Sequence, residues 1–211
     1  MSYQNIEELI DRKPQLAVCK PDIVQFCDAL IECYQNNGKV IVCGNGGSCS
    51  DAGHIVGELM KSFRKKRALT EQLKERLSSF GGMELASKLQ TPLRAIDLTA
   101  MTALNTAIAN DIDPNCVYAQ QVIGLADPGD VFIGISTSGK SKSVHFAAIA
   151  AKAMGSILIG FTGMDGAEMR KSGIYDVLIR IPESITFRIQ EEHISVYHAV
   201  CADTESTLFP E

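Results

Sequence analysis

The sequence lacks three features, and each absence argues against a class of protein. No apolar run approaches the roughly 20 residues that a membrane-spanning helix needs, and the N-terminal stretch MSYQNIEELIDRKPQ is too polar for a signal peptide. The seven cysteines form no C-x-x-C pair, and their odd number argues against a disulfide framework. Basic residues are not in surplus, because the formal net charge is -5, which argues against a general nucleic-acid binder. We therefore expect a cytoplasmic protein with reduced thiols and with neither a membrane nor a nucleic acid as partner.

Short apolar runs alternate with segments of helical periodicity along the chain. Strands are predicted at residues 39–43, 94–98, 131–135, 156–161 and 175–181, and helices at 21–36, 50–63, 100–109, 115–125, 142–154, 166–171 and 187–208. This alternation is typical of a parallel sheet that helices cover on both faces. The sequence predicts an α/β fold, a three-layer α/β/α sandwich with a mainly parallel five-stranded sheet. One domain would span residues 1–211, opened by helices within residues 1–37.

Residues 68–92 interrupt this alternation. Leucines recur at helical spacing on both sides of Gly81–Gly82, namely Leu73, Leu77, Leu85 and Leu89. We predict an inserted helical hairpin that lies at a subunit interface or over the mouth of a substrate pocket. The basic run KSFRKKR at 61–67, just before it, is interpreted as the solvated end of a helix.

Residues 134–141, GISTSGKS, match the G-x-x-x-x-G-K-[ST] pattern of a nucleotide-binding P-loop. Gly134 falls inside a predicted strand, which leaves a turn too short to wrap a triphosphate. The two later strands are followed by Thr-Gly and Pro-Glu, and not by the aspartate that holds magnesium in P-loop proteins. A single phosphate dianion suits four hydroxyls beside a helix N-terminus better, with a hydroxyl-capped helix start as the alternative. These hydroxyls belong to Ser136, Thr137, Ser138 and Ser141.

A second glycine-rich turn, GNGGS, occupies residues 44–48 and also joins a predicted strand to a predicted helix. Gly46 and Gly47 permit positive φ and allow a ligand to approach the backbone closely. In a parallel sheet, such turns at the carboxyl ends of strands converge on one crevice. We therefore expect both turns to contact the same ligand.

The helices at 50–63 and 187–208 carry three of the four histidines. His54 and Glu58 are four residues apart on one helical face, a spacing that an ordinary surface pair also has. Gln190 and His198 are separated by about 80° around the second helix and share a side. Imidazole, carboxylate and amide groups together suit a zinc ion or, alternatively, an acid–base pair.

Four motifs resemble a known family in order and spacing: CGNGGSCSDAGHIVGEL, NDIDPNCVYA, GISTSGKS and RIQEEHISVYH. They are similar to those of the phosphoheptose isomerases, members of the sugar-isomerase (SIS) family of phosphosugar-binding domains. The resemblance covers about residues 20–208 apart from the insertion, and implies a flavodoxin-like SIS fold. Family members typically have asparagine where this chain has Lys140, so one substitution accounts for the P-loop match.

The resemblance implies a function and a set of site residues. The reaction would be the aldose–ketose isomerisation of sedoheptulose 7-phosphate to D-glycero-D-manno-heptose 7-phosphate through an enediol, for heptose-containing surface glycans. A homotetramer with sites at subunit interfaces is implied, with one zinc ion per subunit. Glu58 would be the catalytic base and His198 the acid, whereas His193 would serve core packing. The zinc ligands would be His54, Glu58, Gln190 and His198. The substrate-binding residues would be Asn45, Gly46, Gly47, Glu58, Asn110, Asp111, Ser136, Thr137, Ser138, Ser141 and Gln190.

Other functions stay open at this point. A non-catalytic relative in the same family binds a replication-initiator protein and is similar to this chain in ANDIDPNCVYAQQV and in TLFP. That relative lacks counterparts of Glu58 and His198, and both are present here, which favours an enzyme. A phosphosugar-sensing regulator is less favoured, because no DNA-binding module is predicted. An isomerase of a different phosphosugar remains an alternative, because Lys140 and the insertion depart from the family pattern.

Overall fold

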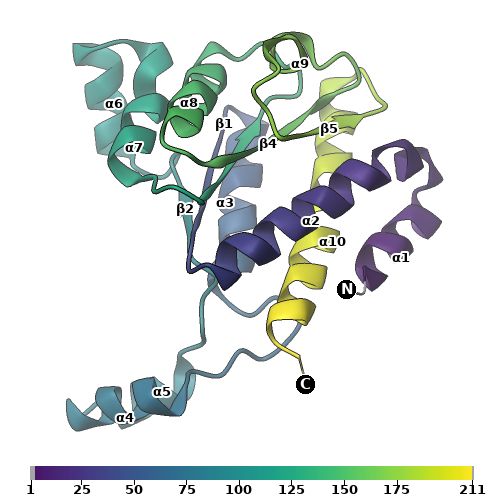
Figure 1. Ribbon diagram of the computed structural model, residues 1–211. Helices are drawn as coiled ribbons and strands as arrows, with labels where there is room; N and C mark the ends of the chain where they lie inside the picture. Colours follow the sequence, from purple (N-terminus) through teal and green to yellow (C-terminus); the bar gives the residue numbers. More distant parts are fainter. Residues whose placement is uncertain (1–2, 211) are drawn as a thin grey trace.

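A five-stranded parallel sheet forms the centre of the computed structural model, which describes residues 3–210 (Figure 1). Its strands are β1 (Val40–Gly44), β2 (Ala95–Asp97), β3 (Val131–Ile135), β4 (Ile157–Gly163) and β5 (Val177–Ile181). They lie in the order β2-β1-β3-β4-β5, and every neighbouring pair is parallel. This is the flavodoxin-like order. The predicted fold class is confirmed.

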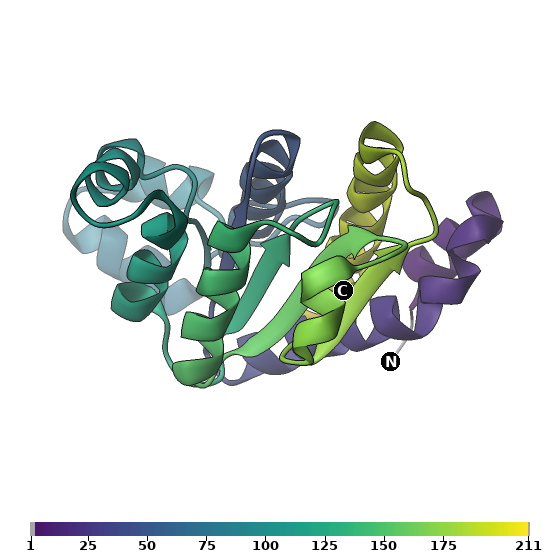
Figure 2. The ribbon, with the colours of Figure 1, turned by 90° about the horizontal axis from the view of Figure 1, so that it is seen from above.

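Helices cover both faces of the sheet, as the view in Figure 2 shows. The α-helices are α1 (Gln4–Arg12), α2 (Lys20–Gln35), α3 (Gly47–Met60), α4 (Glu71–Ser79), α5 (Met83–Lys88), α6 (Thr102–Asp111), α7 (Val117–Leu125), α8 (Lys142–Ala153), α9 (Ala167–Ser172) and α10 (Thr186–Leu208). Two 3-10 helices, η1 (Pro14–Cys19) and η2 (Pro114–Cys116), precede α2 and α7. No helix among residues 3–210 combines the length and the hydropathy that a membrane crossing needs.

The central strands are buried on both faces because each face packs on a different helical layer. Alternate residues of β1 show this directly. Val40 and Val42 pack with apolar residues of α1, α2, α3 and α10. Ile41 and Cys43 pack with those of α7 and α8. This two-sided burial explains why the strand sequences VIVCG and VFIGI are apolar runs without polar alternation.

A buried carboxylate on α10 fixes the loop that follows α3. Glu205 is 1% exposed, and it accepts hydrogen bonds from the backbone N–H groups of Phe63 (2.8 Å), Arg64 (2.7 Å) and Lys65 (2.8 Å). Its Oε1 also lies 3.0 Å from Nε of Arg67, which is itself 1% exposed. The solvated helix end predicted for this basic run is therefore wrong for Arg67.

The buried guanidinium of Arg67 caps the C-terminus of α3. Its Nη1 donates to the carbonyl oxygen of Leu59 (2.8 Å), and its Nη2 donates to that of Glu58 (3.0 Å). A cation at this end of a helix satisfies carbonyl groups that have no partner within the helix, and it interacts favourably with the helix dipole. The Arg67–Glu205 pair thus joins the ends of α3 and α10.

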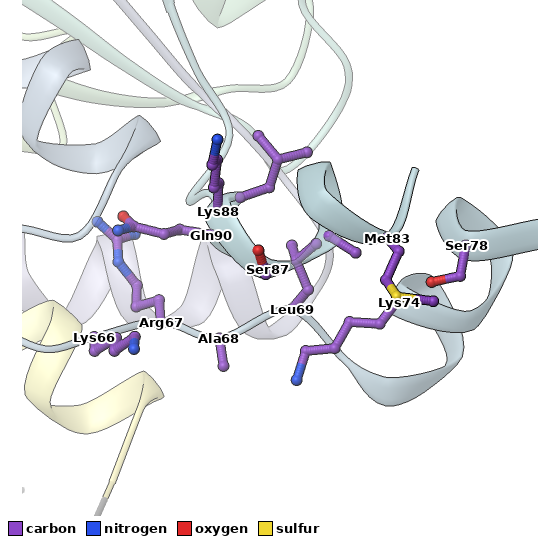
Figure 3. Close-up of a pocket in the computed structure, with 12 residues that line it drawn as sticks. Lys66, Arg67, Ala68, Leu69, Lys74, Ser78, Met83, Ser87, Lys88 and Gln90 are labelled. Carbon is purple, nitrogen blue, oxygen red and sulfur yellow. The ribbon is translucent and has the colours of Figure 1, made fainter. Parts of the chain in front are cut away.

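The predicted helical insertion is present as α4 and α5, which pack on each other and project away from the sheet (Figure 1). Thr70 caps α4, accepting at its side-chain oxygen from the N–H of Leu73. Phe80 and Met83, at the tip, are 91% and 75% exposed. A pocket of about 360 Å³ lies at the root of the insertion, bordered by Arg67 on one side and by residues of α4 and α5 on the other (Figure 3).

Candidate active site

The turns after β1 and β3 meet at the carboxyl edge of the sheet. The amide nitrogen of Asn45 donates to Ser141 Oγ (2.8 Å) and Ser143 Oγ (3.0 Å). The hydroxyl of Tyr118 donates on the other side of the turn to the Gly44 carbonyl and to Asn45 Oδ1, both at 2.9 Å. These bonds hold the GNGGS turn against the start of α8, as parallel-sheet geometry predicts.

The start of α8 offers backbone N–H groups rather than a capped end. Ser141 is the N-cap residue, but its hydroxyl accepts from Asn45 and makes no capping bond. Within the same loop, Ser136 Oγ lies 3.4 Å from the N–H of Ser141, and Ser138 Oγ lies 3.3 Å from that of Lys140. Gly134 lies inside β3, so the turn is as short as the sequence predicted. A helix N-terminus surrounded by hydroxyls suits an anion of phosphate size.

The two glycines of GNGGS have different structural roles. Gly46 has a φ of +58°, the left-handed region that favours glycine, and a Cβ there would meet open space. Gly47 has no positive φ. A Cβ on Gly47 would instead lie 2.3 Å from Nε2 of Gln190. Only glycine fits at position 47, because the side chain of Gln190 on α10 packs against it. From the sequence, we expected a ligand to occupy this space.

Three polar side chains converge between α3 and α10. His54, Glu58 and His198 place one ligand atom each within 4.8 Å of one another. Nε2 of His54 lies 3.3 Å from Nε2 of His198 and 3.2 Å from Oε1 of Glu58, whose Oε2 accepts from Lys61 Nζ (3.0 Å). Two imidazole nitrogens and a carboxylate at one point are a donor set that fits zinc.

Burial affects the protonation of His198. It lowers the pKa of the imidazole, the neighbouring His54 lowers it further, and Glu58 raises it. The neutral ring, which can bind a metal or accept a proton, is therefore favoured. A pocket of about 250 Å³ lies beside His198, bounded by residues of α1, α10 and the loop at Phe63 and Arg64.

Comparisons with known proteins found a family model, relatives in sequence and solved structures that match this chain. The SIS domain model matches residues 81–163. The chain is 39% identical over 207 residues to the phosphoheptose isomerase of Roseiflexus sp. (strain RS-1), with 98% of this chain and 92% of that protein covered. It is 34% identical to the phosphoheptose isomerase of Shewanella sp. (strain ANA-3), with 97% and 93% covered. The structure of phosphoheptose isomerase from Neisseria gonorrhoeae aligns with a TM-score of 0.75 at 33% identity, covering 95% of this chain and 94% of that one. This chain belongs to the phosphoheptose isomerase family.

Membership of the phosphoheptose isomerase family confirms the resemblance found in the sequence motifs. The protein is therefore an isomerase, and the enzyme is favoured over the non-catalytic regulator. Its fold agrees with that of the family, since a second structure, the phosphoheptose isomerase from Francisella tularensis, aligns with a TM-score of 0.74 at 28% identity, covering 95% of this chain and 94% of that one.

Not every residue expected in the site lies with the others. Asn110 and Asp111 are exposed at the end of α6, where the Asn110 amide donates to Asp111 Oδ1 (2.8 Å). His193 is fully buried on α10, in agreement with the packing role expected for it. Gln190 lies eight residues, or about 12 Å of helix rise, before His198, and its amide packs on Gly47.

The sequence interpretation missed Asp51 and Tyr197, which lie behind His54. The Tyr197 hydroxyl is 2.8 Å from Nδ1 of His54 and 3.4 Å from Oδ1 of Asp51. One signal was available, because Asp51 precedes His54 by three residues and so shares its helical face. Tyr197 gave no such signal, since neighbours in a helix point about 100° apart.

Proposed function

We propose that this protein interconverts sedoheptulose 7-phosphate and D-glycero-D-manno-heptose 7-phosphate by aldose–ketose isomerisation. The observation that carries the proposal is the meeting of Glu58 and His198, a carboxylate and an imidazole from helices far apart in sequence. Relatives at 34–39% identity bear the name phosphoheptose isomerase, which supports this substrate class. The reaction would take place in the cytoplasm, and its heptose phosphate product would be used to synthesise heptose-containing surface glycans.

The phosphate group of the substrate is assigned to the loop after β3. Ser136, Thr137, Ser138 and Ser141 supply hydroxyls, and the start of α8 supplies N–H groups. A pocket of about 220 Å³ borders this loop and includes Thr137, Ser138 and Lys140 in its lining. A preformed anion site of this kind fixes one end of a sugar, so that its other end is presented to the reacting groups.

Proton transfer is assigned to Glu58 and His198. Glu58 would remove a proton from the carbon next to the carbonyl and return it to the neighbouring carbon through an enediol. His198, favoured in its neutral form, would move the proton between the two oxygens. Asn45, Gly46 and Gln190 would contact the sugar phosphate, and Gly47 would do so through its backbone, since Gln190 packs on its Cα. Asn110 and Asp111 would bind sugar hydroxyls.

One zinc ion per subunit would be held by His54, Glu58 and His198, with Gln190 as the fourth proposed ligand. The convergence of His54, Glu58 and His198 supports these three ligands. The amide of Gln190 packs on Gly47 and would have to turn toward the zinc ion to complete the set. When bound, zinc would polarise the carbonyl oxygen and stabilise negative charge on it. Glu58 would then have to serve as ligand and base at different moments, or the zinc site would have to be only partly occupied.

The functional unit we propose is a homotetramer of single SIS domains, each spanning residues 1–211, with sites near subunit interfaces. Large apolar side chains on the surface support an assembly. Phe187 on α10 is 58% exposed and Ile112, at the end of α6, is 62% exposed. A subunit contact would remove these exposed apolar side chains from water.

The proposal is tested by incubating the protein with sedoheptulose 7-phosphate in D2O and following the products by NMR. We expect heptose 7-phosphate with deuterium on C2, because the proton returned to that carbon exchanges with solvent. A parallel series of other ketose phosphates tests whether Lys140 and the insertion have changed the preferred sugar. If the protein isomerises another ketose phosphate but not sedoheptulose 7-phosphate, the proposed substrate is wrong and the proposed reaction class still holds.

A further inference from the structure

The imidazole of His54 is held on both of its nitrogens. Nε2 faces Glu58 and His198, whereas Nδ1 faces the hydroxyl of Tyr197 at 2.8 Å. The rings of His54 and Tyr197 are in an edge-to-face arrangement, with centroids 5.4 Å apart and an angle of 78° between the planes. A neutral imidazole carries its proton on one nitrogen only. The contact at Nδ1 therefore competes with Oε1 of Glu58, which lies 3.2 Å from Nε2, for the one proton of the ring.

The Tyr197 hydroxyl has one proton and two neighbours. It lies between Nδ1 of His54 and Oδ1 of Asp51, which is 3.4 Å away. Tyr197 is 1% exposed and Asp51 is 5% exposed, so water has little access to either. Within residues 3–210, Oδ2 of Asp51 has no hydrogen-bond partner. Tyr197 is then the donor on which the buried carboxylate depends.

The energetics favour one direction for this chain of hydrogen bonds. A buried carboxylate without a donor costs more than a neutral imidazole that changes tautomer. Burial raises the pKa of Asp51, and the bond from Tyr197 opposes that rise. The phenol proton therefore goes to Asp51. The phenol oxygen is then free to accept a proton from Nδ1 of His54.

We infer that Asp51 and Tyr197 are positioning residues that favour the Nδ1–H tautomer of His54, which leaves the Nε2 lone pair available to a metal ion held between Glu58 and His198. The inference goes beyond the proposed function, and its metal-binding consequence rests on the proposed zinc site. Groups that accept the second N–H of a metal-binding histidine fix its orientation and strengthen it as a ligand. Asp51, His54 and Glu58 lie on one face of α3. This helix therefore carries two of the proposed ligands together with Asp51, whereas Tyr197 and His198 come from α10.

The first test measures the tautomer of His54 by ¹⁵N NMR of the imidazole nitrogens in the metal-free Glu58→Ala protein, where no carboxylate competes for the proton at Nε2. We expect Nδ1–H in this protein and a shift toward Nε2–H when Tyr197→Phe is added. Adding Asp51→Asn instead should shift the tautomer in the same direction, because an amide nitrogen can donate to the phenol oxygen. A Glu58→Ala protein with His54 in the Nε2–H form would overturn the inference, and so would an unchanged tautomer after Tyr197→Phe.

The second test measures zinc affinity by competition with a chromophoric chelator at constant pH. Tyr197→Phe should weaken zinc binding roughly 10-fold or more, the usual size of such effects. The matched control is Tyr175→Phe, because Tyr175 is partly buried and its buried hydroxyl has no hydrogen-bond partner in the described part of the chain. It should bind zinc as the natural protein does.

Thermal unfolding monitored by circular dichroism checks that both variants fold. Equal zinc affinity in folded Tyr197→Phe and Tyr175→Phe would contradict the inference. Failure of the natural protein to bind zinc would remove the metal from the proposed function. The tautomer measurement would still decide the role of Asp51 and Tyr197, since it needs no metal.

Discussion

Helix α10 and the α4–α5 insertion are both helical, but they differ in what fixes them. α10 packs on α1, α2 and α3, and its buried Asp203 accepts hydrogen bonds from the backbone N–H groups of Asn5 and Ile6, each at 3.0 Å. α4 has no buried residue, and α4 and α5 pack mainly on each other. A side chain on α10, such as His198, is therefore placed by many contacts, as catalysis requires. The exposed apolar tip of the insertion needs a partner outside the chain to become buried.

The largest expected effect concerns the buried ion pair between Glu205 of α10 and Arg67, in the loop that leads from α3 to the insertion. Glu205→Gln should lower the free energy of unfolding by about 3–5 kcal/mol, because it leaves the buried guanidinium of Arg67 without its counter-charge. The measurement is urea unfolding at neutral pH. Glu84→Gln is the matched control, since Glu84 pairs with Lys88 on the insertion with 82% of its side chain exposed. It should change stability by less than about 1 kcal/mol. Equal losses of unfolding free energy in Glu205→Gln and Glu84→Gln would contradict the larger contribution assigned to the buried ion pair.

Burial of His193 on α10 predicts a pH dependence. Burial lowers its pKa from 6.5 to about 4, so the unfolded chain binds the proton more tightly than the folded one. Stability from this group is complete above pH 6.5 and is lost as the pH falls toward 4, by about 3 kcal/mol in total. Unfolding measured across this window should show a smaller loss in His193→Leu than in the natural protein. A natural protein and a variant with parallel pH profiles would contradict the assigned burial.

The insertion can be removed without straining the chain, because Ala68 and Gln90 pair at its base. Replacing residues 70–89 with a short glycine–serine linker should reduce the size of the assembly measured by analytical ultracentrifugation. Stability of the subunit should change little, because α4 packs mainly on α5. Phe80→Asp should weaken assembly in the same direction, because it places a charge on the exposed tip. If assembly size and turnover are unchanged in both variants, the insertion contributes to neither.

The smallest expected effect concerns Lys140. The natural protein should show no magnesium-dependent binding of ATP in calorimetry, because the loop after β3 is too short to wrap a triphosphate. Lys140→Ala should weaken phosphosugar binding by about fivefold, the effect of an exposed charge worth up to about 1 kcal/mol. Magnesium-dependent ATP binding that disappears in Lys140→Ala would restore the P-loop interpretation.

The sequence predicted the features that depend on local periodicity. The apolar runs, the helical hairpin at 68–92 and the start of the last helix are all found close to their predicted bounds. The helix predicted at 50–63 begins instead at Gly47 and ends at Met60, because Arg67 caps it there. Helix ends respond to tertiary partners that a single-sequence pattern does not contain.

The sequence indicated which residue types act as ligands in the candidate site. It did not indicate which residues hold those ligands in place. Spacing placed His54 with Glu58, and motif order connected them to His198. The packing of Gln190 on Gly47 and the bond from Tyr197 to His54 join segments far apart in sequence. Such contacts depend on how α10 is rotated against α3, which no local pattern specifies.

Glu58 and His198 form the reactive centre in the phosphosugar isomerase reaction that we propose. Glu58→Gln keeps the shape of the side chain and removes the base. We therefore expect turnover of sedoheptulose 7-phosphate to fall by roughly 100-fold or more, the usual size of a general-base effect. Binding of the phosphosugar, measured by calorimetry, should survive, because the loop at 136–141 is unchanged. Near-normal turnover in Glu58→Gln would place the base elsewhere and contradict the account.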